Sequence, residues 1–293
     1  MERAKGILYA ALSSSTFGLA PLFTLLLLGL GYSSFEVLSY RWGVASLFLG
    51  ALALLAGRSF RLSWPELRTV FFLSLFRAAT SLSLVIAYQH IASGVASTIH
   101  FMYPLAVVAM MCFFREKGSV WVFAAIGMSI VGAVLLSLGN VDFTRGNTTL
   151  GMVSAAVSVV SYGGYIVGVR KSRAVGIDST VLTCYVMGLG ALYFIAGGLV
   201  TGGIRIETDG TAWLCILGVA LPATAVSNMT LVQAIKRIGP TLTSVFGALE
   251  PLTAVVIGVA VFGEPFTVQG AAGILLIVAA VTIVILHSGR RKA

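Results

Sequence analysis

The chain is a succession of apolar stretches of roughly 20 residues, separated by short breaks that contain glycine, proline or charged residues. At a rise of about 1.5 Å per residue, one such stretch crosses a hydrocarbon core of roughly 30 Å as an α-helix. Strict alternation of apolar and polar residues is absent. The pattern therefore predicts an all-α membrane protein with ten transmembrane helices, over residues 6–30, 34–56, 66–89, 93–114, 119–139, 149–170, 179–201, 211–234, 241–262 and 267–287.

The composition agrees with this pattern. Only 10% of the 293 residues are charged, 58% are hydrophobic, and the mean hydropathy is +1.00. Soluble domains carry about 25% charged residues, so this chain has too few ionic groups to cover a surface in water. A cytosolic enzyme and a secreted domain are therefore excluded as first interpretations, and the lipid bilayer is the expected surroundings.

The remaining bulk features add little chemistry. The net charge of +9 comes from basic residues scattered between apolar runs, so we expect no nucleic-acid partner. The first apolar run, Ile7 to about Leu30, is too long for a signal peptide and is interpreted as an uncleaved span. The three cysteines are single and apolar in context, and neither a metal site nor a cofactor is expected.

Basic residues fall mainly on one side of the predicted bundle. Fifteen Lys and Arg residues lie in the segments that share a side with both termini, and only Arg145 and Arg205 lie on the other. Short loops that stay in the cytoplasm retain Lys and Arg. This asymmetry predicts that both termini are cytoplasmic, in a bacterial inner membrane, and it agrees with an even number of helices.

The sequence also matches itself at an offset of about 145 to 148 residues. Residues 6–13 align with 151–158, 87–91 with 234–238, and Tyr103-Pro104 with Glu250-Pro251. Each unit contains five helices, so the second copy enters the membrane from the opposite side. We therefore expect two inverted repeats, 1–140 and 147–288, followed by a basic tail, 289–293.

The same residues resemble a known family. The second-half stretch from Glu250-Pro251 through Gly263-Glu264-Pro265 to Gly273, with its counterpart from Tyr103-Pro104 through Glu116 to Gly127, is similar to the paired EamA-type repeat of the drug/metabolite transporter superfamily. More narrowly, the runs 101–104 and 161–171 resemble YddG-type exporters of aromatic amino acids, although Tyr103 and Tyr162 stand where tryptophan is expected in that group.

This resemblance implies alternating-access export of amino acids, with aromatic amino acids and methionine foremost, or of similar small amphipathic metabolites. It implies a central cavity lined by helices 1, 3, 4, 6, 8 and 9, with helices 5 and 10 at the periphery. Small residues at four-residue spacing, Ala125, Ser129 and Ala133, suit a close helix contact or a dimer face. The protein is thus expected to be a monomer or a homodimer.

Four ionisable residues fall inside predicted helices and are site candidates because charge is costly in hydrocarbon. Glu250 has two interpretations, a partner for a substrate ammonium or coupling proton, and an ion pair with Arg41 or Arg77. Arg77 either holds a substrate carboxylate or acts as an internal counter-ion, the preferred role. Arg41 is expected to snorkel to the outer interface. His100 is interpreted as a hydrogen-bonded core or cavity residue.

Aromatic and neutral polar residues near mid-span complete the candidate site. Aromatic rings there can stack on an aromatic or thioether side chain. Asn228, Thr224, Ser13 and Ser158 offer neutral hydrogen bonds. Pro104 and Pro251 are expected to bend helices 4 and 9 near mid-depth. The predicted substrate-binding residues are Phe17, Phe76, Arg77, His100, Tyr103, Tyr162, Tyr165, Asn228, Phe246 and Glu250.

Other functions were weighed against this prediction. Within the same superfamily, a broad exporter of drugs or organic cations is the alternative, with Glu250 as the cation partner. An intramembrane enzyme requires clustered catalytic groups such as HExxH, GxSxG or paired aspartates, and the chain has none of these motifs. A channel or a non-transporting receptor stays open, because saturable counterflow is the property that separates a carrier from a pore.

Overall fold

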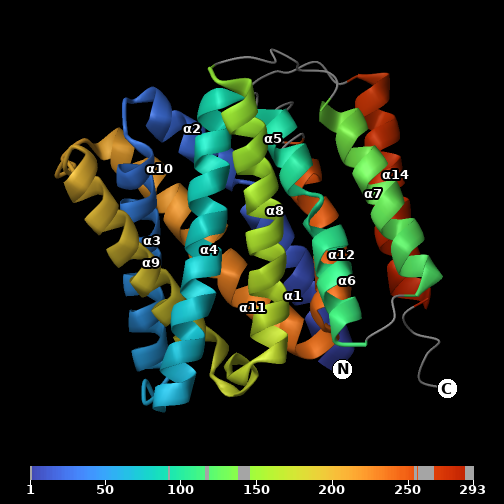
Figure 1. The fold of residues 1–293 in the computed structure, drawn as a ribbon, viewed down its shortest axis with the longest axis horizontal. Helices are drawn as coiled ribbons and strands as arrows, with labels where there is room; N and C mark the ends of the chain where they lie inside the picture. Colours follow the sequence, from blue (N-terminus) through green and yellow to red (C-terminus); the bar gives the residue numbers. More distant parts are fainter. Residues whose placement is uncertain are drawn as a thin grey trace.

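A computed structural model describes residues 2–91, 93–115, 119–137, 146–253, 256 and 267–287, and throughout that part the regular elements are helices (Figure 1). Seven helical segments are long and apolar enough to cross a membrane, and two shorter apolar helices, Val120–Leu135 and Val268–Ile283, accompany them. The ninth expected span is described only to residue 253 and at 256. The expected all-α membrane fold is confirmed.

The elements follow the predicted spans closely in order and position. They are α1 (Glu2–Phe17), α2 (Ala20–Gly29), α3 (Ser34–Leu55), α4 (Trp64–His90), α5 (Ser93–His100), α6 (Tyr103–Phe113), α7 (Val120–Ser137), α8 (Thr148–Lys171), η1 (Arg173–Gly176), α9 (Ser179–Thr201), α10 (Gly210–Ala220), η2 (Leu221–Val226), α11 (Ser227–Ile238), α12 (Pro240–Val245), η3 (Phe246–Ala248) and α14 (Val268–His287).

Several predicted features lie outside the described residues. They are Glu116 and Lys117, the loop residues Asp142 and Arg145, Ala254, the break at Gly263 to Pro265 with Glu264, and the basic tail 289–293.

Three spans that the hydropathy pattern predicts as continuous are broken. The first span breaks at Gly18 and Leu19, and the fourth at Phe101 and Met102, just before Pro104 as expected. In the eighth span, η2 is a π-helical segment containing Pro222. Proline removes a backbone donor and clashes with the carbonyl four residues earlier, and a wider turn accommodates both effects. The breaks therefore follow from proline inside otherwise apolar helices.

The long helices pack in pairs. Helix α3 contacts α9, α4 contacts α8, α1 contacts α11, and α7 contacts α14. Figure 1 shows α7 and α14 side by side at one edge of the bundle, with α3 and α9 toward the opposite edge. Helices 5 and 10 are thus peripheral, as the family resemblance implies.

The small residues of α7 face the rest of the chain. Ala125, Ser129 and Ala133 are buried, and Gly132 lies so near the carbonyl oxygen of Gly273 and the side chain of Ile277 that a Cβ would not fit. Small residues allow helix backbones to approach closely in a membrane. Of the two roles expected for this stripe, the close helix contact is made within the chain.

Four other glycines mark close helix crossings around the first and sixth spans. At each, a Cβ would meet the side chain of one neighbouring residue at or below the normal contact distance. The pairs are Gly6 with Ile238, Gly151 with Ile91, Gly18 with Thr253 and Gly163 with Ala106. These glycines set how closely α1 and α8 approach the helices around them.

Contacts among loops gather the basic segments at one end of the bundle. Arg237 pairs with Glu2 at 3.1 Å, Arg58 Nε lies 3.6 Å from Asp178, and the guanidinium of Arg170 donates to the carbonyl of Lys236 at 3.0 Å. These bonds join the N-terminus to the loops after α3, α8 and α11. The basic loops predicted to share a side therefore do so, as far as they are described.

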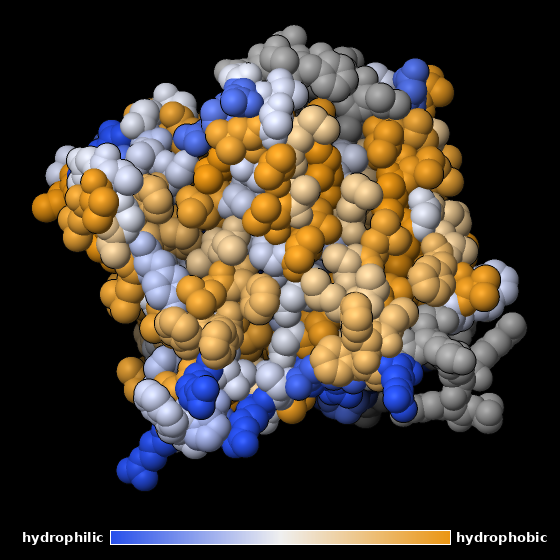
Figure 2. All heavy atoms as spheres, in the orientation of Figure 1, coloured by the Kyte–Doolittle hydropathy of each residue, from blue (hydrophilic) through white to orange (hydrophobic). Residues whose placement is uncertain are grey.

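The other end is held by a separate network. Arg205 Nε lies 3.1 Å from Glu36 Oε1, and its guanidinium carbon lies 4.0 Å from the ring centroid of Tyr32. Between the two ends, Figure 2 shows a belt of hydrophobic side chains, with the most hydrophilic ones along the lower and upper edges. Such a belt matches the hydrocarbon core of a bilayer.

The contact between α3 and α9 provides a stability test. A Cβ at Gly190 would overlap the fully buried ring of Trp42. We expect Gly190→Ala to lower the free energy of unfolding by about 1–3 kcal/mol, because overpacking forces the ring to shift. Thermal unfolding in detergent micelles measures this effect.

Gly43→Ala on α3 is the matched control, since a Cβ there meets nothing within 4 Å. It should leave the unfolding temperature unchanged or raised, because alanine is the better helix former. Equal destabilisation by both substitutions would contradict the described α3–α9 contact.

Candidate functional site

Eight of the ten predicted site residues meet in the middle of the bundle. Each is at most 8% exposed. We call these residues the central group: Phe17, Arg77, His100, Tyr103, Tyr162, Tyr165, Asn228 and Glu250. They come from α1, α4, α5, α6, α8, α11 and the helical residues 249–253. Segments far apart in the sequence thus bring aromatic, cationic and acidic side chains to one buried place.

Arg77 lies at the centre of this group. Its Nε donates to Asn228 Oδ1 at 2.7 Å, and its Nη1 lies 3.4 Å from Ser81 Oγ, one turn further along α4. Its guanidinium carbon lies 5.1 Å from the ring centroid of Tyr162 and 5.4 Å from that of Phe17. Hydrogen bonds and cation–π contacts therefore fix this guanidinium in place.

Arg41 lies beside the central group and is 4% exposed, so the expectation that it snorkels to the interface is wrong. Helix α3 packs against η2, and Arg41 Nε donates to Thr224 Oγ1 at 2.5 Å. The Thr224 hydroxyl in turn donates to the carbonyl of Val219, five residues earlier, at 2.7 Å. The guanidinium carbon of Arg41 lies 5.8 Å from the ring centroid of Phe17.

Both arginines are thus held by one irregular segment. Thr224 belongs to η2, and Asn228 follows in α11, where its Nδ2 donates to the carbonyl of Thr224 at 2.8 Å. The π-helical turn determines how these two residues are rotated about the helix axis. The break in the eighth span consequently positions the partners of both guanidinium groups.

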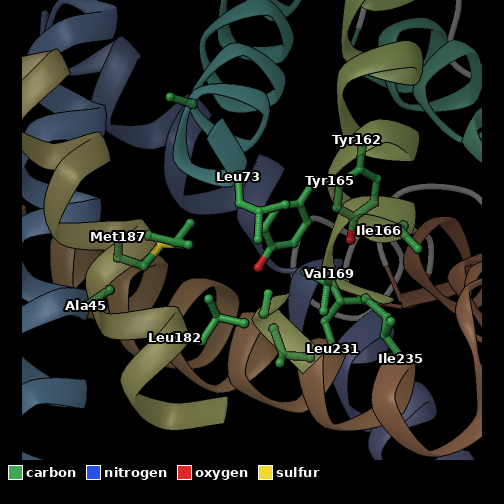
Figure 3. Close-up of a cluster of buried hydrophobic side chains, with 14 of the residues drawn as sticks. Ala45, Leu73, Tyr162, Tyr165, Ile166, Val169, Leu182, Met187, Leu231 and Ile235 are labelled. Carbon is green, nitrogen blue, oxygen red and sulfur yellow. The ribbon is translucent and has the colours of Figure 1, made fainter. Parts of the chain in front are cut away.

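Tyr162 is the centre of the aromatic contacts. Its ring stacks on those of Phe17 and His100, with centroids 6.3 and 5.2 Å apart, and meets Tyr103 edge-on at 4.6 Å. Figure 3 shows Tyr162 and Tyr165 together on α8, with Leu73 of α4 beside Tyr165. These rings form an apolar wall against which a flat or thioether side chain can pack.

Glu250 does not pair with either buried arginine. Its Oε1 accepts a hydrogen bond from the Tyr103 hydroxyl at 3.2 Å. Among the described residues, no ion pair within 4.0 Å joins it to Arg41 or Arg77. The internal ion pair expected as one interpretation of Glu250 is therefore not formed in this conformation, and its carboxylate stays available to another partner.

His100 is hydrogen-bonded, as expected. Its Nδ1 lies 2.8 Å from Ser158 Oγ on α8. In the described part of the chain, no group of three His, Cys, Asp or Glu side chains is arranged to hold a metal ion.

Three buried polar atoms of this region have no hydrogen-bond partner among the described residues. They are Arg41 Nη2, His100 Nε2 and the Tyr165 hydroxyl. Buried polar atoms are nearly always satisfied by protein, water or ligand. The concentration of three such atoms around the central group indicates a place where a bound molecule supplies the missing partners.

The remaining two predicted residues lie elsewhere. Phe76 is 43% exposed and lines an outer groove of about 690 Å³ between α4 and α8. It directly precedes Arg77, and neighbouring residues on a helix point about 100° apart. Phe246 is buried, but it packs with Ala10 and Ala234, away from Tyr162. Next to it, Gly247 is the residue that faces the Tyr103 hydroxyl.

Some residues of the site were not predicted. Ser81 supports Arg77, and Tyr88 lies 3.3 Å from Ser97 through their hydroxyls in a neighbouring buried contact. The position of Ser81, four residues after Arg77 and therefore on the same helix face, is a signal that could have identified it. The pairing of Arg41 with Thr224 left no such signal, because the two residues lie 183 positions apart.

The bond between Arg41 and Thr224 can be tested by substitution. Thr224→Val keeps the side-chain shape but removes the acceptor of a buried charged donor. We expect the free energy of unfolding to fall by about 1–3 kcal/mol, since a buried unsatisfied polar group carries that penalty. Thermal unfolding of the detergent-solubilised protein measures the loss.

Thr282→Val on α14 is the control, since its exposed hydroxyl donates to a carbonyl of its own helix, that of Val278. This substitution should change the free energy of unfolding by less than about 0.5 kcal/mol. Equal effects of the two substitutions would argue against a structural bond at Arg41.

Comparisons with known proteins agree with this picture. The chain is 26% identical to an uncharacterized transporter, YojE, of Bacillus subtilis over 283 residues, covering 91% of this chain and 88% of that protein. It is 25% identical over 237 residues to an uncharacterized transporter of Archaeoglobus fulgidus, covering 81% and 83% of the two chains.

One crystal structure superposes with a TM-score of 0.78 and 21% identity over 99% of each chain, which indicates a shared fold. The EamA-like transporter family matches two parts of the sequence, residues 4–138 and 149–286, and so covers nearly the whole chain. The protein therefore belongs to the EamA-like transporter family, as a multi-pass membrane transporter.

Proposed function

We propose that this transporter is an alternating-access exporter of amino acids or similar small amphipathic metabolites, with aromatic amino acids and methionine foremost. The observation that carries the proposal is the central group itself. Its aromatic wall around Tyr162 lies between a fixed guanidinium, Arg77, and a carboxylate that has no arginine partner, Glu250. A carboxylate, an apolar side chain and an ammonium can each find a complementary surface there.

Alternating access follows from the proposed inverted repeat of residues 1–140 and 147–288. The close crossings of the glycines support it, because the sequence offset exchanges them. Gly6 against Ile238 becomes Gly151 against Ile91, and Gly18 against Thr253 becomes Gly163 against Ala106. The helix pairs behave likewise, since α4 with α8 corresponds to α11 with α1. Halves related in this way can exchange conformations and open the central group to either side.

The orientation in the membrane is part of the proposal. The end that carries Arg58, Arg170 and Arg237 faces the cytoplasm, because short basic loops are retained there. The N-terminus lies at this end through the pair of Glu2 and Arg237. The end held by Arg205 and Glu36 then faces the exterior, and export runs from the basic end toward it.

The aromatic wall gives the first functional test. Tyr103→Ala and Tyr162→Ala are each expected to raise the KM for labelled phenylalanine about tenfold in proteoliposomes. A lost aromatic contact contributes about 0.5–1.5 kcal/mol, and 1.4 kcal/mol corresponds to a factor of ten. Both variants should first be shown to elute as monodisperse protein.

Phe76→Ala is the matched control, because Phe76 lies on the outer surface beside Arg77. Its KM should stay within about twofold of the unsubstituted protein. Unchanged phenylalanine transport by both tyrosine variants would show that the pocket has been assigned to the wrong place.

The alternative, an exporter of organic cations, is favoured by one observation, the buried carboxylate of Glu250 without an arginine partner. Glu250→Gln separates the two functions. A carrier of amino acids should keep part of its transport, because the carboxylate end of the substrate is still held by Arg77, whereas a cation carrier should lose nearly all.

Counterflow of labelled phenylalanine and of labelled tetraphenylphosphonium measures the two activities in the same proteoliposomes. Glu66→Gln is the control, since this exposed residue caps α4 and glutamine retains the capping interaction. Loss of cation counterflow in Glu250→Gln, with no phenylalanine counterflow in either protein, would favour the cation exporter.

A further inference from the structure

The ionisable groups around the central site do not balance. Arg41 and Arg77 contribute two positive charges and Glu250 one negative charge, all of them at most 8% exposed. A zwitterionic amino acid adds no net charge and would leave one positive charge uncompensated. A substrate with a single negative charge would bring the total to zero. Charge within hydrocarbon costs about 2.5–3.5 kcal/mol per residue, so this difference is large enough to select between substrates.

We propose that Arg41 and Arg77 form a two-arginine anion site, and that the preferred substrate is a small aromatic or apolar carboxylate without a compensating ammonium group. The inference rests on the proposed function and names the substrate class of the same site. It also gives a binding role to Arg41, which the sequence pattern assigned to the membrane interface.

The partners of both guanidinium groups are neutral. Arg41 donates to a threonine hydroxyl, and Arg77 donates to an asparagine amide oxygen and lies near a serine hydroxyl. Elsewhere the chain does pair arginine with carboxylate, as Arg205 with Glu36 at 3.1 Å. Neutral partners orient a guanidinium without neutralising it, so both arginines keep their attraction for an anion.

Geometry allows one small anion to reach both groups. The two guanidinium carbons lie 5.8 and 5.4 Å from the centroid of the same Phe17 ring. Arg41 Nη2 is a buried donor without a partner among the described residues. A carboxylate has two oxygens, and each can accept from a different guanidinium.

The surroundings define the rest of the substrate. The rings of Phe17 and Tyr162 lie within 6 Å of the guanidinium carbon of Arg77. An inorganic anion would leave these rings without a contact, whereas an aryl or alkyl group attached to the carboxylate would pack against them. The expected ligand is therefore an aryl-alkyl carboxylate.

Three probes that share one phenyl ring test the inference. They are 3-phenylpropionate, an anion, phenylalanine, a zwitterion, and phenethylamine, a cation. Thermal stabilisation of the detergent-solubilised protein near pH 7 measures binding, and counterflow in proteoliposomes measures transport. We expect 3-phenylpropionate to act at a concentration at least tenfold lower than phenylalanine, and phenethylamine to have no effect.

Each other outcome has a definite meaning. Tighter binding of phenylalanine than of 3-phenylpropionate overturns the anion preference and leaves the proposed amino acid exporter intact. Stabilisation by phenethylamine alone overturns both, in favour of a cation carrier. If none of the three probes binds or is transported, the proposed substrate class fails and the inference fails with it.

Variants then test the two arginines. Arg41→Gln and Arg77→Gln should each abolish the preference for 3-phenylpropionate over phenylalanine, and Arg41→Lys, which keeps the charge, should retain part of it. Arg68→Gln is the control, because Arg68 is exposed near the start of the same helix as Arg77. An unchanged preference in folded Arg41→Gln would exclude Arg41 from the site, and the comparison of probes on the unsubstituted protein remains decisive if that variant does not fold.

Discussion

Two guanidinium groups in the middle of a hydrocarbon-spanning bundle, held by neutral side chains, are the feature on which the remaining architecture depends. Each needs hydrogen-bond acceptors at mid-depth, where a regular helix offers none from its backbone. The eighth span meets this need by widening into η2, which presents Thr224 to Arg41 and, one turn later, Asn228 to Arg77. Charge burial, helix irregularity and the location of the site are therefore aspects of one arrangement.

The other interrupted spans serve the same region. The break after Phe17 leaves that ring between both arginines, and the break before Tyr103 brings its hydroxyl to Glu250. Non-helical backbone is tolerated at membrane depth only where protein or a polar cavity surrounds it. By contrast, α7 and α14 at the edge of the bundle have no break along the residues described. Irregularity is thus concentrated where polar groups are needed and absent where the chain faces lipid.

Much of this could be predicted from the sequence, because hydropathy, basic loops and proline act locally. The spans, the peripheral helix pair and the bend at Pro104 follow from such signals. What could not be predicted is rotation about the helix axis, which neighbouring helices determine. Phe76 and Arg77 are adjacent, yet one faces outward and the other inward, and Phe246 is turned away while Gly247 faces Tyr103. Arg41 fails for a similar reason, since its partner Thr224 becomes a neighbour only once α3 packs against η2.

The π-helical turn also makes the two halves unequal. Its counterpart in the first half, α4, is a continuous α-helix from Trp64 to His90, so only the second half contains the inserted turn. If the halves exchange conformations as proposed, the inward-facing and outward-facing states are not mirror copies and differ in free energy. An empty carrier of this kind has a preferred resting orientation, and substrate binding must supply the energy to leave it.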